Sequence, residues 1–396
     1  MQADLGERTL GPAEMPEHPV PNPVPNFFLI AGEASGDTHG SALIVRLKER
    51  FPQAAFHGLG GPKMRALAPD LEDWSDEAAV LGLWEVLKKY GYFRRKMDET
   101  FAAIETLRPD VVIPIDYPGF NLRLAKALRQ RGFHGEIAYY ISPQVWAWKR
   151  GRIREMARTL DLMMCIFPFE KELYEASGLA TVFVGHPLAD EFSHLDPANV
   201  PREENLVGLF PGSRSREIEA LFPTMVQAAA ILHASHPELS FVTAAVNERL
   251  ATRLTAIAAE HGASVEVSSG DIHTLMRRCS CAVIASGTAT LEAAFLGLPY
   301  CLVYRVAWLT ALAARVLMKV PYLGIVNNLA GREVVRELLQ EDATAEPIAR
   351  ELQRLLESSE ARRALSQELL ATAATLGTGG APENAARAIA GLLKSP

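Results

Sequence analysis

The strongest constraint on the fold is a repeated alternation of short β-branched segments with longer helical ones. From Phe27 onward, six segments have the composition of buried strands: FFLIAG, AAFHGLGG, DVVIPID, GEIAYYIS, DLMMCIF and TVFVGHP. Between them, segments such as DTHGSALIVRLKERF place apolar residues three and four positions apart, which is the helical period. This alternation predicts βαβ units and a parallel sheet.

The alternation stops once and then restarts. Residues 194–205, HLDPANVPREEN, are polar and carry two prolines, so they are the best candidate for a linker. After them come NLVGLF, LSFVTAAV, ASVEVSS, CAVIAS and YCLVYRV, each followed by a helical pattern. From about Arg332 helical patterns follow one another, beginning with REVVRELLQ. We therefore expect an α/β protein with two doubly wound Rossmann-like domains and C-terminal helices that brace them.

The predicted domain boundaries follow from these changes of pattern. Residues 1–26 lack both the basic start and the apolar core of a signal peptide. They are acidic and Pro-rich, and we expect them to be a disordered tail. The first domain is predicted at 27–200, the second at 201–345 and the bracing helices at 346–396. Two such domains face each other across a cleft at the carboxyl ends of both sheets, where ligands bind in these folds.

Composition excludes several classes of protein. The net charge of −7 argues against a nucleic-acid binder, which needs a concentrated basic surface. No stretch has the roughly 18 apolar, uncharged residues that a transmembrane helix requires. The four cysteines lack zinc-type spacing, so we expect reduced, buried side chains in a cytoplasmic protein. A Walker lysine and a GxGxxG with a distant acid are both missing, so neither ATP hydrolysis nor a nicotinamide cofactor is indicated. We expect no cofactor, and no metal site either, because no DxD-like acidic pair is placed to hold a metal.

Two loops of the second domain suit phosphate. In PGSR a strand runs into a helix start, where a glycine admits close approach and Arg214 can fork onto phosphate oxygens. In SGTATLEAA small hydroxylated residues open a helix, and Glu292 follows one turn later, where it could accept hydrogen bonds from ribose. A plain turn or an ordinary N-cap would explain either loop alone. Together they favour a nucleotide-diphosphate site, formed by Gly212, Ser213, Arg214, Ser286, Gly287, Thr288 and Glu292.

The first domain offers a candidate base at the end of the strand DVVIPID. Asp116 is the last strand residue, Pro118 and Gly119 force a turn, and Asn121 can start the next helix. A carboxylate fixed there could take a proton from an attacking hydroxyl, although a simple turn residue is the alternative.

Other residues of the first domain are candidates for a sugar or acceptor site. The first strand-to-helix turn holds Gly32, Ser35, Gly36 and Asp37, with helix capping as the alternative role of Asp37. The segment YYISPQVWAWKRGRI crowds aromatic residues such as Trp146 beside basic ones such as Arg152. Trp-rich walls suit sugar faces or acyl chains and basic residues suit a phosphate, although a packed core edge is an equal alternative. His186 ends the sixth strand on the cleft side, where a structural role is the alternative.

Two segments combine apolar, aromatic and basic residues, as an interfacial helix on an anionic leaflet does. They are 80–97, VLGLWEVLKKYGYFRRKM, and 305–323, RVAWLTALAARVLMKVPYL. Core helices with solvated lysines are the alternative.

The ordered motifs resemble those of the lipid-A-disaccharide synthase family. They are AGEASGD, GLGGPKM, IDYPGFN, SPQVWAWKRGRI, FPFEKELYE, FVGHPLAD, PGSRSREIEAL, SGTATLEAA and NNLAGREVVRELLQ, and they extend from about Phe27 to Gln340. The resemblance implies an inverting GT-B glycosyltransferase that acts on the cytoplasmic face of the inner membrane. Its donor would be UDP-2,3-diacylglucosamine and its acceptor 2,3-diacylglucosamine 1-phosphate (lipid X), giving a β-1,6-linked tetraacyl disaccharide 1-phosphate and UDP.

The resemblance also implies roles for individual residues. Asp116 is the candidate base, and Arg214 is a residue needed for activity. Where family members often have IDAPDFN, this chain has IDYPGFN, so Gly119 replaces a second carboxylate and leaves Asp116 as the better candidate. The first domain would bind the acceptor and lipid and the second the nucleotide sugar, and a homo-oligomer is left open. The alternatives are an enzyme like UDP-N-acetylglucosamine 2-epimerase, and a non-catalytic nucleotide-sugar binding module.

Overall fold

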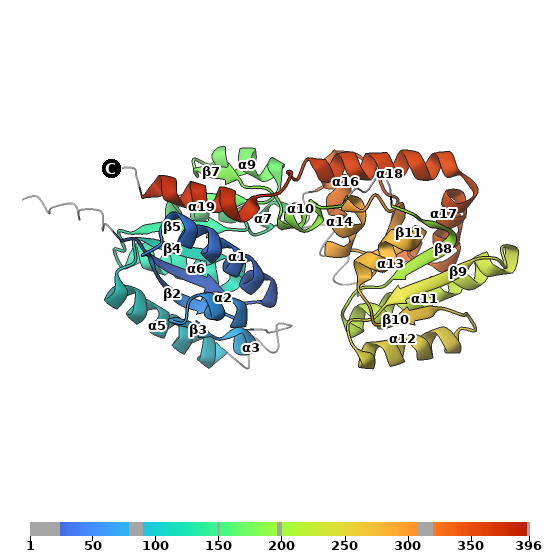
Figure 1. Cartoon of the computed structure of the whole chain (residues 1–396), viewed down its shortest axis with the longest axis horizontal. Helices are drawn as coiled ribbons and strands as arrows, with labels where there is room; N and C mark the ends of the chain where they lie inside the picture. Colours follow the sequence, from blue (N-terminus) through green and yellow to red (C-terminus); the bar gives the residue numbers. More distant parts are fainter. Residues whose placement is uncertain (1–23, 79–89, 149–150, 196–199, 307–319, 394–396) are drawn as a thin grey trace, which may run out of the picture.

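The computed structural model describes residues 24–78, 90–148, 151–195, 200–306 and 320–393. It contains two sheets in which every strand pairs in parallel with its neighbours, each covered by helices (Figure 1). We call the sheet of β1–β7 with its helices the first lobe, and the sheet of β8–β13 with its helices the second lobe. The predicted class, two doubly wound α/β units in tandem, is confirmed.

The first sheet has the order β3-β2-β1-β4-β5-β6-β7. Its strands are β1 (Asn26–Ala31), β2 (Ala55–Gly60), β3 (Leu71–Asp73), β4 (Val111–Ile115), β5 (Glu136–Tyr140), β6 (Leu162–Cys165) and β7 (Thr181–Phe183). Strands buried on both faces read as continuous apolar runs, and β1 is such a strand. Phe27 and Leu29 enter one apolar cluster, whereas Phe28 and Ile30 enter the cluster on the opposite face.

The helices of the first lobe connect these strands in sequence. They are α1 (Ala34–Arg50), α2 (Pro62–Leu67), α3 (Ser75–Ala78), α5 (Tyr90–Leu107), α6 (Pro118–Gln130), α7 (Val145–Trp148), α8 (Gly151–Thr159) and α9 (Pro168–Glu175). The chain order of the strands reverses between β1 and β4. Ligands bind at such reversals in open α/β sheets, outside the carboxyl ends of the strands.

The second sheet has the order β10-β9-β8-β11-β12-β13 and reverses between β8 and β11. Its strands are β8 (Glu203–Phe210), β9 (Ser240–Ala244), β10 (Glu266–Ser268), β11 (Cys279–Ala285), β12 (Tyr300–Tyr304) and β13 (Glu337–Leu339). Its helices are α11 (Ser215–Ser235), α12 (Glu248–Glu260), α13 (Ile272–Arg278), α14 (Thr288–Phe295), α16 (Ile325–Ala330), the 3-10 turn η2 (Gln340–Asp342), α17 (Ala345–Glu357) and α18 (Ser359–Ala374).

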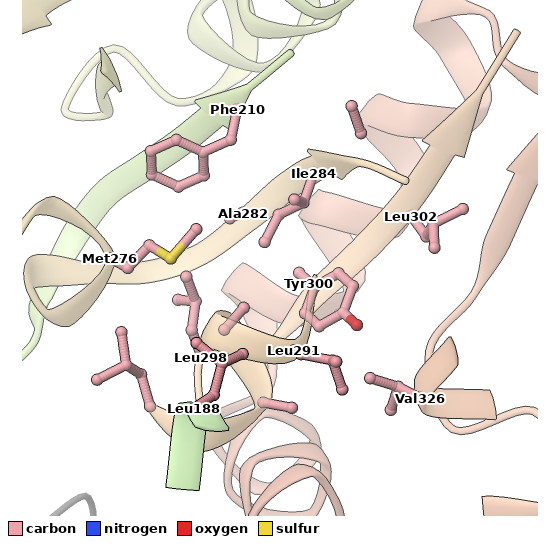
Figure 2. Packing of buried hydrophobic residues seen from close by; sticks show 14 of the residues in the cluster. Leu188, Phe210, Met276, Ala282, Ile284, Leu291, Leu298, Tyr300, Leu302 and Val326 are labelled. Carbon is pink, nitrogen blue, oxygen red and sulfur yellow. The ribbon is translucent and has the colours of Figure 1, made fainter. Parts of the chain in front are cut away.

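Two helices join the lobes. The helix α10 (Pro187–Phe192) leaves the first lobe, and its Leu188 belongs to the apolar cluster that also contains Leu291 and Leu298 of the second lobe (Figure 2). After α18 the chain returns, and α19 (Ala381–Leu392) packs on α1 of the first lobe (Figure 1). The lobes are therefore connected by the chain twice.

The start of α19 is anchored on α10. The carboxylate of Asp190 accepts hydrogen bonds from the backbone N–H groups of Gly380 (2.5 Å) and Ala381 (3.1 Å). A carboxylate at this position neutralises the positive end of the helix dipole and satisfies two of its unpaired donors. The C-terminal helices thus contact both lobes, as the bracing role predicted for them requires.

Two elements differ from the sequence predictions. Residues 332–340 were expected to be helical, but they contain β13, which pairs with β12 at the edge of the second sheet. The apolar pairs of VVRELL fit a short strand as well as a helix, so that prediction was wrong. The three-residue strand β3 was not foreseen.

Several predictions fall outside the described residues. These are the tail up to residue 23, the apolar part of 80–97 as far as residue 89, and 307–319 within the second apolar-basic segment. The predicted linker, 194–205, lies between α10 and β8, and β8 already begins at Glu203.

Candidate active site

A cavity of about 680 Å³ lies between the carboxyl ends of the two sheets. Its first-lobe wall includes Ser35, Asp116 and His186, and its second-lobe wall includes Ser286, Gly287 and Thr288. Loops that follow β1, β4 and β7 thus face the loop that follows β11. The cavity brings together six of the predicted site residues, drawn from both lobes.

Asp116 is held in an unusual backbone conformation at the end of β4. Its φ is +45° and that of Tyr117 is +50°, so two consecutive residues are left-handed. Non-glycine residues seldom adopt this conformation, and it persists where surrounding contacts impose it. The Asp116 N–H donates to the carbonyl of Tyr140 on β5 at 2.9 Å.

The Asp116 carbonyl is also fixed, by two buried side chains. It accepts hydrogen bonds from the Asn121 amide at 2.7 Å and from the Tyr139 hydroxyl at 2.5 Å. The Asn121 amide also reaches the carbonyls of Ile30 and Ile115, at 3.4 and 3.3 Å. Asn121 is completely buried, so its amide acts on the backbone of the β4 turn and does not face the cavity.

The environment of Asp116 makes its carboxylate a stronger base. The pKa of Asp116 is raised to about 6, mainly by burial and also by the nearby charge of Glu33, while a backbone hydrogen bond from Tyr117 acts in the opposite direction. A group with this pKa is mainly ionised at neutral pH and accepts a proton more readily than an exposed aspartate. Glu33 belongs to the AGEASGD motif but was not singled out from the sequence.

Of the residues predicted at the turn after β1, one lines the cavity and the two glycines lie in closely packed positions. Ser35 lines the cavity, and His39 joins it from the next turn of α1, since residues four apart share one face of a helix. A side chain on Gly32 would collide with the Tyr117 ring, because a Cβ there would lie 2.5 Å from it. Gly36 packs closely against Ala31 and is not among the lining residues.

Asp37 is buried and caps a helix. Its carboxylate accepts hydrogen bonds from the backbone N–H groups of Gly61, Lys63 and Met64, at 3.0, 3.0 and 2.9 Å. These groups lie at the start of α2, so the carboxylate anchors α2 to α1 and is not among the residues that line the cavity. Capping was the alternative noted for Asp37, although here it caps a neighbouring helix instead of its own.

His186 faces the cavity as a neutral side chain. Its Nδ1 accepts a hydrogen bond from the Leu188 N–H at 3.1 Å and so caps α10. Burial lowers the pKa of His186 to about 4, with His39 as a smaller cause, and burial likewise lowers the pKa of His39. Neither imidazole therefore carries a positive charge into the cavity at neutral pH.

Trp146 lies behind the cavity wall, where it contacts the buried carboxylate of Glu170. The indole N–H donates to Glu170 at 2.9 Å, and the ring packs edge-on against Phe169. Glu170 also accepts hydrogen bonds from the Ser142 hydroxyl at 2.6 Å and the Phe167 N–H at 3.2 Å. Burial raises the pKa of Glu170 to about 7. The wall residues Ser142 and Phe167 are thus held by this carboxylate, which sequence reasoning missed.

On the second lobe, the turn after β11 presents the start of α14 to the cavity. The Ser286 N–H is bonded to the Val303 carbonyl at 3.1 Å, which fixes the turn to β12. Glu292 lies one turn into α14 and pairs with His273, Nε2 to carboxylate oxygen, at 3.3 Å. This hydrogen bond to Glu292 raises the pKa of His273. Glu292 is not among the lining residues, although its neighbour Leu291 is.

The PGSR loop follows β8 but does not line this cavity. Gly212 has a φ of +103°, which favours glycine, and a Cβ there would lie 2.3 Å from the Glu217 carboxylate. Arg214 is exposed and pairs with Glu217 at 3.0 Å, and Ser213 is exposed beside it. The structure therefore separates Gly212, Ser213 and Arg214 from the residues gathered around Asp116.

Sequence reasoning also missed Gln144 of the cavity wall. Arg152, one of the basic residues noted in its segment but not predicted to belong to the site, lines the cavity as well. Within the described residues, no group of three or more His, Cys, Asp or Glu side chains is arranged to hold a metal ion. None of the described helices has the length and apolar character needed to cross a membrane. All four cysteines are buried and unpaired, as predicted.

Known proteins match the chain over most of its length. The family model described as Lipid-A-disaccharide synthetase matches residues 27–389. The lipid-A-disaccharide synthase of Geobacter metallireducens is 38% identical over 376 residues, covering 92% of this chain and 96% of the relative. That of Syntrophus aciditrophicus is 39% identical over 373 residues, covering 91% and 95%.

Solved structures resemble the fold at low sequence identity. UDP-GlcNAc 2-epimerase of Neisseria meningitidis, solved with UDP-GlcNAc bound, has a TM-score of 0.58 and 12% identity over 94% of this chain and all of that one. MurG of Acinetobacter baumannii has a TM-score of 0.55 and 14% identity over 93% and 100%. At these identities the likeness supports the two-domain GT-B fold and nothing narrower.

Proposed function

We propose a specific reaction and mechanism for this chain, which belongs to the lipid-A-disaccharide synthase family and is thus a glycosyltransferase that forms the lipid A disaccharide. The proposed donor is UDP-2,3-diacylglucosamine, and the proposed acceptor is 2,3-diacylglucosamine 1-phosphate. The products are the β-1,6-linked tetraacyl disaccharide 1-phosphate and UDP, formed with inversion at the donor carbon.

The observation that carries the proposal is the position of Asp116 opposite the start of α14 in one cavity. A partly buried carboxylate, Asp116, lines the first-lobe wall with its pKa raised to about 6, and Ser286, Gly287 and Thr288 line the second-lobe wall. The first supplies a proton acceptor and the second supplies hydroxyls and backbone N–H groups for phosphate oxygens. A glycosyl transfer from a sugar diphosphate needs both.

The proposed chemistry is one displacement at C1 of the donor sugar. The acceptor 6-hydroxyl oxygen bonds to C1 while the bond from C1 to the diphosphate oxygen breaks. The hydroxyl proton passes to Asp116, and UDP leaves with the bonding electron pair. Because the nucleophile enters opposite the leaving group, the configuration at C1 inverts.

The leaving diphosphate gains negative charge, which the second lobe would stabilise. The N-terminus of α14 lines the cavity and can supply donors. Removing one donor of this type costs about 2.7–4 kcal/mol in well-studied sites. Arg214 pairs with Glu217 here, so a role on the diphosphate requires that it exchange this partner for phosphate. Glu292 would accept a ribose hydroxyl in exchange for His273 in the same way.

We also propose the functions of the two lobes and a place of action. Residues 27–200 would bind the acceptor and its acyl chains, and residues 201–345 the nucleotide sugar. The enzyme would act on the cytoplasmic face of the inner membrane, where its basic and aromatic segment near 80–97 would meet anionic lipid. Lys96 of that segment is not available for lipid, because it is buried and paired with Glu72 at 2.8 Å and Glu99 at 2.7 Å.

The competing functions are disfavoured by specific observations. The fold is shared with UDP-GlcNAc 2-epimerases, but at 12% identity, whereas the match to lipid-A-disaccharide synthases reaches 39% over nearly the whole chain. A binding module would not require a carboxylate whose pKa is raised to about 6 in the cavity.

The reaction is tested by incubating the purified protein with both substrates and detecting UDP and the disaccharide by mass spectrometry. Asp116→Asn should lower kcat by about 100-fold or more while the protein stays folded, since general base catalysis contributes about 10²–10⁴-fold. For the wild type, the rate should fall as pH drops through about 6, because Asp116 then becomes protonated. Near-normal turnover of a folded Asp116→Asn variant would remove Asp116 from the base role.

A charge variant checks the origin of this pH dependence. Glu33→Gln removes the negative charge that helps to raise the pKa of Asp116. The acid limb of the pH–rate profile, where the rate falls as Asp116 is protonated, should therefore move to lower pH. The move should be small because burial is the larger cause. Glu49→Gln, at the far end of α1 and paired with Arg46, is the matched control and should leave the limb in place.

A further inference from the structure

The charges that line the cavity are unevenly distributed. The Asp116 carboxylate supplies a negative charge, and the imidazoles of His39 and His186 are neutral because burial lowers both pKa values. Among the described residues that line the cavity, the remaining charged side chain is Arg152, in the first turn of α8. Of these described residues, it is the one that brings a positive charge to the cavity at neutral pH.

Arg152 has no partner within the part of the chain that the structure describes. Glu155, three residues further along α8, is the acidic neighbour that could pair with it. Glu155 instead pairs with Lys126 of α6 at 2.5 Å. An arginine that lines a cavity with its five donors unused is suited to an anionic ligand, and the planar guanidinium matches phosphate oxygens in a two-pronged hydrogen bond.

The lobe to which Arg152 belongs indicates which of the two phosphate groups it can bind. The proposed reaction brings a diphosphate on the donor and a phosphate monoester on the acceptor into one cavity. The start of α14 lies on the second-lobe wall, whereas Arg152 belongs to the first lobe, as does the proposed base Asp116. The acceptor must lie against the base, so its phosphate is the one that falls on the same wall as Arg152.

We propose that Arg152 binds the phosphate monoester of the acceptor and makes the enzyme selective for a phosphorylated acceptor sugar. This rests on the proposed function, because it takes the acceptor to be a sugar 1-phosphate. The attacking hydroxyl is on C6 and the phosphate on C1, so the two groups lie on opposite sides of the sugar ring. Asp116 at one end and Arg152 at the other would then fix which hydroxyl points at the donor carbon.

The kinetic test compares Arg152→Ala with Arg154→Ala. Arg154 is exposed on the same helix and does not line the cavity, so it controls for loss of surface charge. For Arg152→Ala we expect the KM for the phosphorylated acceptor to rise roughly 10- to 100-fold, the range for losing a charge-assisted hydrogen bond. The KM for the UDP-sugar should not change. Arg152→Lys should restore only part of the lost affinity for the acceptor, because an ammonium cannot form the two-pronged hydrogen bond of a guanidinium.

The decisive arm uses 2,3-diacylglucosamine without its phosphate as the acceptor. The wild type should prefer the phosphorylated acceptor, and Arg152→Ala should lose that preference, whereas Arg154→Ala should keep it. A rise in the KM for the UDP-sugar instead would assign Arg152 to the donor diphosphate and overturn the proposal. An equal loss with both acceptors would also overturn it, because Arg152 would then support the fold of the site.

Equilibrium binding separates this proposal from the proposed reaction. Titration calorimetry with the phosphorylated acceptor and no donor should show weaker binding to Arg152→Ala than to the wild type. If the wild type binds the phosphorylated acceptor more tightly than Arg152→Ala does and yet forms no disaccharide, the proposed reaction is wrong and the phosphate site stands. If disaccharide forms and binding is the same in both proteins, the phosphate site is wrong and the reaction stands.

Discussion

Tyr139 and Tyr140 are consecutive residues of β5, and both are fully buried, but their hydroxyls differ in what they contact. The Tyr139 hydroxyl donates to the carbonyl of Asp116, whereas that of Tyr140 has no hydrogen-bond partner among the residues that the structure describes. Successive side chains of a strand point to opposite faces, so only one of the two can reach the β4 turn. Tyr139 is thereby a positioning residue for the proposed base.

Phenylalanine substitutions at these two positions form a matched pair. Tyr139→Phe removes one bond that holds the left-handed Asp116, and we expect kcat to fall roughly tenfold while the KM for the UDP-sugar stays the same. Tyr140→Phe removes an unpaired buried hydroxyl, so it should leave kcat unchanged and slightly raise the free energy of unfolding. Steady-state kinetics and denaturant unfolding measure both. Equal kcat values for the two variants would contradict the positioning role.

How much of the site could be predicted from sequence depends on the range of the interactions involved. The place of Asp116 at a strand end was predictable, because an apolar run followed by Pro118 and Gly119 marks that point. The raised pKa of Asp116 was not, since it depends first on burial in the folded protein and then on Glu33, which lies in a different turn. Gly119 is exposed with open space around it, so packing does not require a glycine there. The replacement of the aspartate of IDAPDFN by Gly119 therefore matters because a carboxylate is missing, and matters less for the shape of the turn.

At the scale of elements, α9 shows how a buried carboxyl group can organise a wall of the site. Its Glu170 is completely buried and accepts hydrogen bonds from Ser142, Trp146 and the Phe167 backbone. Sequence alone places Glu170 three residues into a helix, where an exposed side chain is the ordinary outcome. Its burial follows from the packing of α9 against the loop after β5, which no local pattern specifies.

The raised pKa of Glu170 predicts an unusual dependence of stability on pH. Between its ordinary value of 4.5 and about 7, the native state keeps a proton that the unfolded state has lost. The unfolded state therefore binds fewer protons, and the free energy of unfolding falls as pH rises through this window. The part due to Glu170 amounts to about 3 kcal/mol at most.

Denaturant unfolding at pH 5 and pH 8 tests this. The difference in stability between the two pH values should be smaller for Glu170→Gln than for the wild type. The difference that remains comes from the other shifted groups. The pKa of Glu136 is raised to about 7 and that of Asp116 to about 6, which act in the same direction, whereas the lowered pKa values of His186 and His39 act in the opposite direction. Glu175→Gln, on the exposed side of the same helix, should behave like the wild type. If Glu170→Gln keeps the full difference, Glu170 is ionised in the folded protein well below pH 7.

For the molecule as a whole, the two-lobed plan was predictable and the path of the C-terminal helices only in outline. The repeated alternation of strand and helix dictates two parallel sheets, each with a reversal that marks a binding edge. The segments that became α17, α18 and α19 have similar patterns, so sequence alone could not say which lobe each one covers. That is decided by the left-handed glycines Gly377, Gly379 and Gly380, which redirect the chain, and by Asp190, which receives the start of α19.

The proposed membrane contact is a property of the whole molecule, because lipid substrates must reach a cavity between the lobes. The helix α5 carries Arg94 and Arg95 on its exposed side, next to the buried Lys96. Arg95 lies 3.7 Å from Glu99, and both side chains are exposed, so this pair is weak and leaves the arginine free to meet an anionic surface. Basic residues near such a surface contribute about 1 kcal/mol each, a contribution that salt screens.

Charge reversal at these two positions should therefore release the protein from anionic membranes. In sedimentation with vesicles of phosphatidylglycerol and phosphatidylethanolamine, Arg94→Glu/Arg95→Glu should lower the partition coefficient by at least about 25-fold, since each lost contact of this strength is worth roughly fivefold. Arg350→Glu/Arg363→Glu, which makes the same change of charge on exposed positions of α17 and α18, should bind as the wild type does. Phosphatidylcholine vesicles should capture none of the three proteins. Equal loss in both double variants would mean that net charge alone drives the binding, and unchanged binding in the first would place the contact on another surface.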